Sequence, residues 1–507
     1  MNQPRAAGQP SRMAVSPLAR NAVWNVAGSG MPMLIGLVSI PVLIRTMGAD
    51  RFGVLTLAWA LIGYSSLFDL GLGRALTKVV AERIETSGRS QIPELFWGSM
   101  FLLFGLSLLA AGSILALTPW LVRTLHMPSS LHGEASACFY LLGFCTPFVI
   151  VAAGLRGMLE ALQRFDLVNA VRIPSGAFTY AGPLLVLPFS HGLPAVVAVL
   201  VVGRAAVCLV QLALCFRVMP DLRTVARPCA RVLRPLVHMG AWMTLSNVVS
   251  PIMANLDRFL IAAMLSVGAA AYYVVPCELI TRLLVLPIAI VAVLFPAFSA
   301  SFASDPGRTA TLFGSSLKYV FLILFPVLLV VLVFAREALT VWLGPAFAAN
   351  SFQILQWLAA GALLNGLAQI PLTLIQGVGR ADLAAKLHLL ELPLYLCAVF
   401  FLIHWYGVVG AAMAWTARVA FDAAGLFAIS ARLLGRRNWP WARSGAFIAG
   451  GVVVLGIGGA MIHLPAKGLW LFAGLCYLAF AFRFFAARSG AALAWRSAPQ
   501  TQSSVEL

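Results

Sequence analysis

The sequence predicts an all-α integral membrane protein of about 14 transmembrane helices, with two parallel six-helix repeats around a central cavity plus two C-terminal helices. Three observations predict this class. Of the 507 residues, 61% are apolar and only 10% are charged, whereas an ordinary globular domain has roughly 25% charged residues. About fourteen segments are long and apolar enough to cross a bilayer. Basic residues fall on alternate sides of these segments.

Each predicted span follows from length, because a helix needs roughly 20 apolar residues to cross the hydrocarbon core. Long runs of Ala, Leu and Val without period-2 alternation favour helices over barrel strands. The predicted spans are residues 22–44, 53–73, 95–120, 136–158, 168–189, 194–216, 237–264, 270–299, 317–335, 351–376, 384–403, 407–429, 445–464 and 469–487.

The loops predict the orientation. Alternate loops and both termini hold 26 of the 35 basic residues, and the loops on the other side hold 5. Because basic residues in short loops resist translocation, both termini are expected in the cytoplasm. The net charge of +18 then reflects orientation and contact with anionic lipid, and nucleic acid is not an expected partner. The first apolar run has span length and no cleavage site after it, so it is expected to be retained.

Short matches indicate an internal repeat. LEALQRFDL at residues 159–167 resembles IQGVGRADL at residues 375–383, at a shift of 216, and two weaker matches have a shift of 217. Six spans in each half give parallel repeats. The predicted division is a cytoplasmic tail (1–20), an N-lobe (21–218), a basic linker (219–235), a C-lobe (236–435), two extra helices (436–487) and a cytoplasmic tail (488–507).

The motifs of common enzymes do not occur in the chain. There is no nucleotide-binding loop, nucleophile elbow or HExxH, and the cysteines show neither metal-ligand nor disulfide-framework spacing. We expect no catalytic residue, cofactor or metal. Without a nucleotide site, an ion gradient or the substrate gradient must drive transport.

Ionisable residues inside spans are costly in lipid and are therefore the default functional candidates. They are Arg204, Asp257, Arg258, Glu278, Arg282, Glu391, Arg418 and Asp422. Glu278/Arg282 and Arg418/Asp422 are spaced i,i+4. Within each pair the two charges can form an ion pair along one helix, or the two residues can belong to a transport site. Glu391 is expected to pair with Lys386 or His388. Proline breaks at Pro32 and Pro251 lie close to equivalent positions of the two halves and indicate either hinges at a transport site or ordinary kinks.

Four motifs carry a family resemblance. They are FDLGLGRALTK at residues 68–78, RTMGADRFG at 45–53, DRFLI with GAAAY at 257–261 and 268–272, and QGVGRAD at 376–382. Together they resemble the polysaccharide (O-antigen and exopolysaccharide, Wzx-type) flippases of the multidrug/oligosaccharidyl-lipid/polysaccharide (MOP) exporter superfamily. The two extra helices depart from the twelve-helix pattern of that family.

The resemblance implies a flippase for undecaprenyl-pyrophosphate-linked oligosaccharide, in the inner membrane of a bacterium, working by alternating access for lipopolysaccharide or other surface polysaccharide biosynthesis. Polymerase and chain-length machinery are the implied partners. The expected headgroup contacts are Arg258 and Arg282, with Arg204 and Arg418 as further substrate-binding candidates. Asp257, Glu278, Glu391 and Asp422 are expected to couple ions or pair with the arginines, and Asp69, Arg74, Pro32 and Pro251 to act in gating.

Two other functions remain open. A cation-coupled multidrug exporter has the same architecture, although four intramembrane arginines fit a cationic drug poorly. A glycan polymerase or ligase is an enzyme and needs larger external loops than this chain has.

Overall fold

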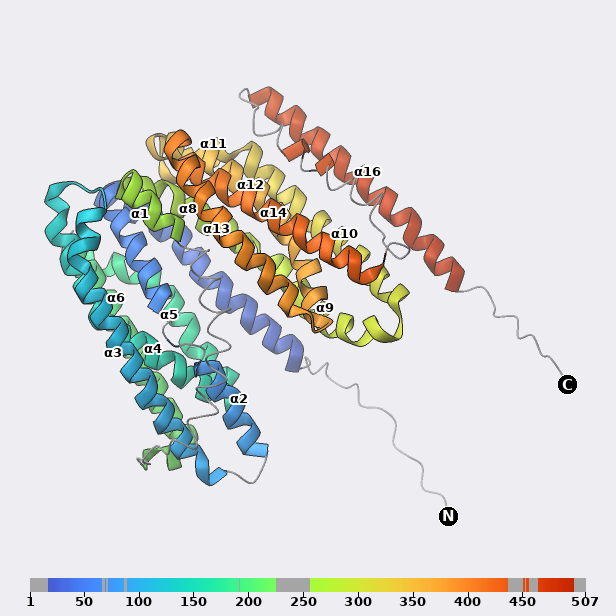
Figure 1. Ribbon diagram of the computed structural model, residues 1–507. Helices are drawn as coiled ribbons and strands as arrows, with labels where there is room; N and C mark the ends of the chain where they lie inside the picture. The colour runs from blue at the N-terminus through green and yellow to red at the C-terminus, as the bar shows by residue number, and fades with distance from the viewer. Residues whose placement is uncertain are drawn as a thin grey trace, which may run out of the picture. The chain divides into compact units, whose positions relative to one another are not determined.

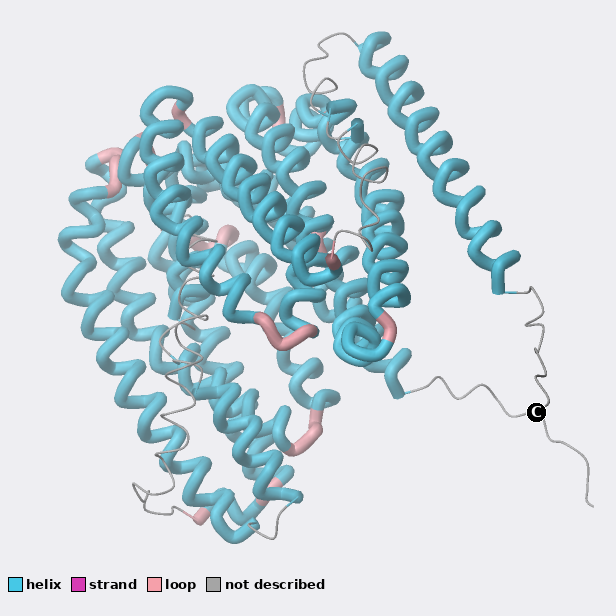
Figure 2. Tube along the Cα trace, turned by 45° about the vertical axis from the view of Figure 1, so that its right-hand side comes forward, coloured by secondary structure: helices cyan, strands magenta, loops and turns pink. Residues whose placement is uncertain are grey.

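The computed structural model describes residues 17–65, 69, 72–85, 89–190, 192–224, 256–435, 450–451, 453–455 and 464–496. Nearly all of them are helical, and the described part of the chain contains no strand (Figure 2). Six of its helices are long and apolar enough to cross a membrane: α3, α4 with the short turn before it, α6, α10, α12 and α13. The protein is therefore an all-α integral membrane protein, and the total of about fourteen spans stays a prediction.

Most consecutive helices follow one another through short connections (Figure 1), whereas residues 225–255 and most of 436–463 lie outside the described part of the chain. The first group is α1 (Pro17–Ser65), α2 (Leu72–Glu85), α3 (Ile92–Thr124), α4 (His132–Ala161), α5 (Phe165–Val186) and α6 (Leu193–Val218). After a helical segment at 256–264, the second group is α8 (Val267–Leu283), α9 (Val285–Ser304), α10 (Pro306–Val333), α11 (Ala335–Leu343), α12 (Pro345–Gly377), α13 (Ala381–Tyr406), α14 (Val408–Leu434) and α16 (Leu464–Arg496).

The segment α1 consists of two helices that meet at a kink at Gly48, where φ is 80° and ψ is 165°. This kink lies between the first two expected spans, 22–44 and 53–73. One predicted span differs from the structure: the expected eighth span, 270–299, is two helices joined at Leu284. Hydropathy does not detect this division, because a change in backbone angles leaves the apolar character of the segment unchanged.

Contacts between residues divide the chain into two compact units. The first contains α2–α6 and all of α1 except the segment Phe52–Leu57. The second contains α8–α16 together with the short segments Phe52–Leu57 and Thr124–Met127. The predicted linker at 219–235 lies mostly outside the described residues, so the domain limits given above remain predictions.

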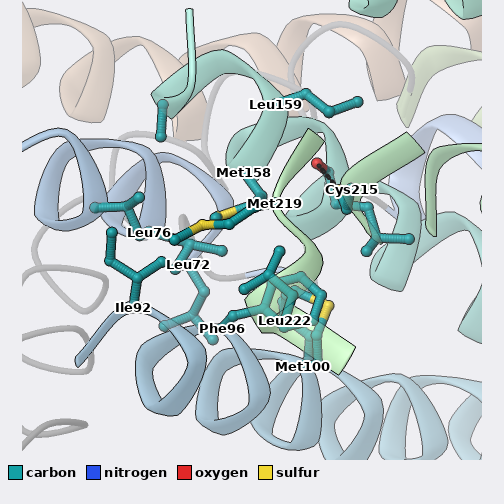
Figure 3. Packing of buried hydrophobic residues seen from close by; sticks show 14 of the residues in the cluster. Leu72, Leu76, Ile92, Phe96, Met100, Met158, Leu159, Cys215, Met219 and Leu222 are labelled. Atoms are coloured by element: carbon teal, nitrogen blue, oxygen red, sulfur yellow. Dashed lines mark hydrogen bonds between the residues drawn. The ribbon is translucent and has the colours of Figure 1, made fainter. Parts of the chain in front are cut away.

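The core of the first unit lies where α2, α3, α4 and the end of α6 meet (Figure 3). Leu76, Phe96, Met158 and Leu222 are fully buried in it. The helices approach closely because Gly157 of α4 faces the backbone of α2, and the Thr77 hydroxyl of α2 donates to the Gly157 carbonyl at 3.0 Å. The most specific sequence motif, residues 68–78, thus supplies the helix that packs on α4.

A bidentate ion pair ties three helices of the first unit together. The Arg51 guanidinium donates to both carboxylate oxygens of Glu134, at 3.2 and 2.8 Å. The Leu193 amide at the start of α6 donates to the same carboxylate at 3.1 Å. Bidentate pairs of this kind hold geometry well. Arg51 of the 45–53 motif therefore fixes α1, just after its kink at Gly48, to the starts of α4 and α6.

The second unit is organised around α12, which contacts α8, α9, α10, α11, α13 and α14. Its apolar window is 72% buried, the highest share among the six candidate spans. On α10, Phe321 and Phe325 stack with ring centroids 5.0 Å apart. A helix enclosed on so many sides needs apolar residues over most of its circumference.

The internal repeat is confirmed at the turns between α4 and α5 and between α12 and α13. Gln163 and Gly379, 216 residues apart, both have positive φ, at 57° and 80°. Each is followed by an arginine paired with an aspartate two residues later, Arg164 with Asp166 and Arg380 with Asp382. The same short-range backbone hydrogen bonds close both turns. The duplicated sequence therefore folds into duplicated local geometry.

The C-terminal helix α16 is held to the second unit by a buried lysine. Lys467 Nζ donates to both oxygens of Glu337 in α11, at 2.8 and 2.9 Å, and its side chain is only 5% exposed. The Tyr477 ring lies 5.9 Å from Phe325 of α10, and Gly474 lets α16 approach Leu329. The extra C-terminal segment is thus an integral part of this unit.

We expect Lys467→Ala to weaken the attachment of α16 by about 1–2 kcal/mol. Loss of a fully buried ion pair would cost more, but Glu337 is partly exposed and water screens its charge. Burial raises the pKa of the Glu337 carboxyl, but the hydrogen bond from Lys467 and further backbone and charge interactions outweigh it, so its pKa lies below the ordinary value. A lowered folded-state pKa gives stability above the unfolded value of about 4.3, lost as pH falls below it. Limited proteolysis of the C-terminal segment between pH 7 and pH 3 measures this, and Glu337→Gln should remove the pH dependence.

Candidate functional site

Seven of the eight predicted intramembrane charges meet in the second unit, on the segment 256–264, α8, α13 and α14. They form one polar cluster with three residues that the sequence analysis did not select as site residues. The ten members are Asp257, Arg258, Tyr273, Glu278, Arg282, His388, Glu391, Tyr395, Arg418 and Asp422. The eighth predicted charge, Arg204, lies in the first unit.

One half of the polar cluster joins the segment 256–264 to α8. The Arg258 guanidinium donates to Glu278 at 2.9 Å, and Arg282 reaches the other oxygen of Glu278 at 3.4 Å. The adjacent Asp257 faces away from Glu278 and accepts a hydrogen bond from the Tyr273 hydroxyl. The predicted Glu278/Arg282 pair is therefore present, but Glu278 is shared by two arginines.

The other half joins α13 to α14. Arg418 lies 3.6 Å from Glu391, which is 1% exposed, and His388 lies 3.5 Å from Asp422. Of the two readings left open for Arg418 and Asp422, the structure favours a shared site, because each pairs with a residue of α13. The expected pairing of Glu391 with Lys386 or His388 is wrong, since its ion-pair partner is Arg418. Lys386 pairs with Asp382 instead. Both ion pairs therefore form across the α13–α14 contact.

The Arg418 guanidinium and Tyr395 connect the two halves of the polar cluster. The guanidinium lies over the Tyr395 ring, 5.4 Å from its centroid, and both residues interact electrostatically with Asp257. Four carboxylates face three guanidiniums and one imidazole, so the charges are largely compensated. Both oxygens of Glu391 lack a hydrogen-bond partner among the described residues. A buried carboxylate in this state is suited to accept a proton or a small cation.

Arg204 of α6 has a different environment. It donates to the Thr179 hydroxyl at 3.1 Å and to the Ser175 hydroxyl at 3.4 Å, both on α5. Within the described part of the chain, no carboxylate pairs with it. A guanidinium has five N–H donors, so the two hydroxyls leave several for a ligand.

The structure describes the side chains of two of the four gating candidates, Pro32 and Asp69. Pro32 is buried in α1 beside Gly176 of α5, whereas Asp69 precedes α2 with its carboxylate near Gly73. Arg74 is described only by its place in the backbone of α2, and Pro251 lies outside the described residues. Their gating roles remain predictions.

The sequence analysis missed His388, Tyr273 and Tyr395 as site residues. His388, Glu391 and Tyr395 are spaced i, i+3 and i+7 on α13, which places them on one helix face. That spacing around a known intramembrane carboxylate was the available signal. Among the described residues, no group of three His, Cys, Asp or Glu side chains is arranged to hold a metal ion.

Comparison with known sequences decides the family. The profile of the polysaccharide biosynthesis protein family matches residues 18–302, more than half of the chain. The chain belongs to this family. A relative named "Putative O-antigen transporter", from Shigella flexneri, is 32% identical over 407 residues, which cover 80% of this chain and 96% of the relative.

Solved structures of MOP-superfamily transporters share the fold of this family member. The lipid II flippase MurJ, in an inward closed conformation, has a TM-score of 0.65 at 13% identity, covering 93% of this chain and 99% of that chain. An inward-facing multidrug-resistance transporter of the MATE family also has a TM-score of 0.65 at 13% identity, covering 83% and 96%. The relative from Shigella flexneri is named as a transporter, and the two solved structures are named as a flippase and a transporter; none of the three is named as an enzyme.

Proposed function

We propose that this member of the polysaccharide biosynthesis protein family flips an undecaprenyl-pyrophosphate-linked oligosaccharide from the cytoplasmic to the periplasmic leaflet of a bacterial inner membrane. The observation that carries the proposal is the match over 96% of a relative named as an O-antigen transporter. Alternating access, with both termini in the cytoplasm, is the proposed mechanism. Polysaccharide polymerase and chain-length machinery are the proposed downstream partners.

The polar cluster supports an anionic headgroup through Arg282. Its side chain is 30% exposed, and it shares Glu278 with Arg258, whose side chain is 9% exposed. Two guanidiniums on one carboxylate leave a positive charge to which a phosphate can bind bidentately. We therefore propose that Arg282 contacts the anionic headgroup directly. Arg258 would contact it only in a state in which this arginine has left Glu278 and pairs with the headgroup instead.

The carboxylates of the polar cluster support a coupling role. Glu391 is enclosed, with Arg418 and Asp422 acting on it electrostatically. Protonating it would release Arg418 toward Asp422 or Asp257, which changes the α13–α14 contact. In this proposal Glu391 and Asp422 couple proton binding to movement, while Asp257 and Glu278 orient the arginines.

A gene deletion in the native host tests the function. The expected result is lipid-linked oligosaccharide accumulating in the cytoplasmic leaflet, with loss of surface glycan. Accumulation in the periplasmic leaflet would contradict the proposal in favour of a polymerase or ligase. No accumulation in either leaflet, together with increased drug sensitivity, would favour a multidrug exporter.

For the headgroup contact, we expect Arg282→Gln to lower the flipping rate in reconstituted vesicles by about tenfold or more, because one charge-assisted contact is worth about 1.5–3 kcal/mol. Arg308→Gln, an exposed arginine at the start of α10, is the matched control and should flip at the normal rate. Equal rates for both variants at equal expression would remove Arg282 from the site.

A further inference from the structure

The helix pair α5–α6 of the first unit and the pair α13–α14 of the second unit are repeat equivalents, and each places an arginine of the second helix against the first. Arg204 faces Ser175 and Thr179, and Arg418 faces Glu391 and Tyr395. Ser175 and Glu391 are 216 residues apart, as are Thr179 and Tyr395, and Arg172 and His388. This is the shift of the duplicated turns, and it relates the first helices of the two pairs. Arg204 and Arg418, on the second helices, are 214 residues apart, so they occupy comparable but not identical positions of the repeat.

The two sites differ in charge. In the second unit, Glu391 and Asp422 face Arg418 and His388. In the first unit, serine stands in the place of Glu391, threonine in that of Tyr395 and a second arginine in that of His388. Placing a guanidinium in a membrane span without a carboxylate is costly, and two hydroxyls do not neutralise it. The first unit therefore keeps the cation and lacks the anion.

A cavity of about 240 Å³ opens beside Arg204, between α4, α5 and α6. Three guanidiniums line it, those of Arg156, Arg172 and Arg204. No carboxylate stands among its described lining residues, although Arg156 lies 3.8 Å from Glu160 one turn further along α4. Gln211 also lines it and is 5% exposed, and its Oε1 lacks a hydrogen-bond partner among the described residues. A carboxamide can present either its oxygen or its NH₂ to a ligand. A polar group left unsatisfied at the wall of a cationic cavity indicates a place for a polar ligand.

A second cavity of about 380 Å³ adjoins the first and shares Arg204, Ser175 and Thr179 with it. The rest of its lining is apolar, and Val202 and Val210 on α6 are 67% and 48% exposed. Arg204 thus stands at the junction between a cationic cavity and an apolar groove along α5 and α6. This junction matches an amphiphile with an anionic head and a hydrocarbon chain.

We propose that the α5–α6 pair binds the pyrophosphate of the lipid-linked cargo, with the first part of the polyprenyl chain in the apolar groove. Several guanidiniums suit a pyrophosphate, which carries more than one negative charge, better than a single-charged phosphodiester. This inference rests on the proposed function, because it takes its ligand from there. It adds a site contained entirely within the first unit and separate from the polar cluster.

The test measures Kd for farnesyl pyrophosphate on the purified full-length chain by native mass spectrometry. We expect Arg204→Gln and Ser175→Glu each to weaken binding by about tenfold or more. Ser175→Glu rebuilds in the first unit the carboxylate of the second, so it neutralises Arg204 without removing it. Ser175→Gln is its neutral control of equal size, and Arg217→Gln is the control on α6. Both controls should bind within about threefold of the wild type.

A further variant tests the apolar groove. Ala206→Phe fills the apolar cavity, so it should weaken the binding of farnesyl pyrophosphate and leave the binding of inorganic pyrophosphate unchanged. Unchanged binding in Arg204→Gln and Ser175→Glu overturns the site. If inorganic pyrophosphate binds as tightly as farnesyl pyrophosphate, the apolar groove does not hold the hydrocarbon chain. If phosphatidylglycerol displaces farnesyl pyrophosphate as well as unlabelled farnesyl pyrophosphate does, the assignment of the cargo is wrong. The binding assay involves no transport, so the two proposals can fail separately. A variant that loses binding while reconstituted vesicles still flip the cargo refutes this site alone. If farnesyl pyrophosphate binds as expected but the gene deletion causes no accumulation of lipid-linked oligosaccharide, the proposed function alone is refuted.

Discussion

Replacing Arg418 by methionine is expected to lower the free energy of unfolding by about 3–5 kcal/mol, because it leaves a buried carboxylate without its counter-ion. Glu391 is 1% exposed and has Arg418 as its ion-pair partner in the structure. Asp257 and Asp422 also lie within electrostatic range of this region. Denaturant-induced unfolding of the purified protein in detergent measures the loss.

The double variant Arg418→Met/Glu391→Gln should recover most of that stability, because it removes both charges of the pair. Arg282→Met is the control for removing a guanidinium from the same cluster. Its side chain is 30% exposed and Glu278 keeps Arg258, so the expected loss is about 1 kcal/mol or less. If the double variant is no more stable than Arg418→Met, the charge pair is not the cause.

Replacing Gly410 by alanine is expected to destabilise the second unit by about 3 kcal/mol or more through a backbone clash. A Cβ at this position would lie 1.9 Å from the Leu402 carbonyl oxygen. Gly407 alone connects α13 to α14, with φ 60° and ψ −141°, a conformation that favours glycine. The added Cβ would meet backbone atoms and not a flexible side chain that could move aside. The two helices must therefore separate. Their separation would also break the Arg418–Glu391 and His388–Asp422 pairs.

Gly468→Ala on α16 is the matched control, because nothing lies within 4 Å of its added Cβ. A helical glycine replaced in open space should gain about 0.5–1 kcal/mol. Thermal unfolding of the two variants side by side measures the difference. Equal midpoints would show that α13 and α14 are not held as close as the structure has them.

The spans and the repeat could be predicted largely from the sequence, with specific failures. Apolar length located α3, α4, α6, α12 and α13 within a few residues, since crossing lipid is a demand on composition alone. It placed the start of α10 at residue 317, whereas this helix begins at Pro306. It also did not detect the division between α8 and α9 at Leu284. That division depends on backbone angles at a single residue, which local composition does not fix.

For the candidate site, the sequence determined which charges lie in the membrane, because each carries its own desolvation cost wherever its helix packs. It also held the 216-residue shift that relates Ser175 to Glu391. Only the tertiary structure decided the partners. Glu391 takes Arg418 and Asp422 takes His388, while Arg204 meets hydroxyls instead of a carboxylate. The reason is physical: an ion pair depends on distances of a few ångströms between faces of different helices, and those distances arise only when the helices pack.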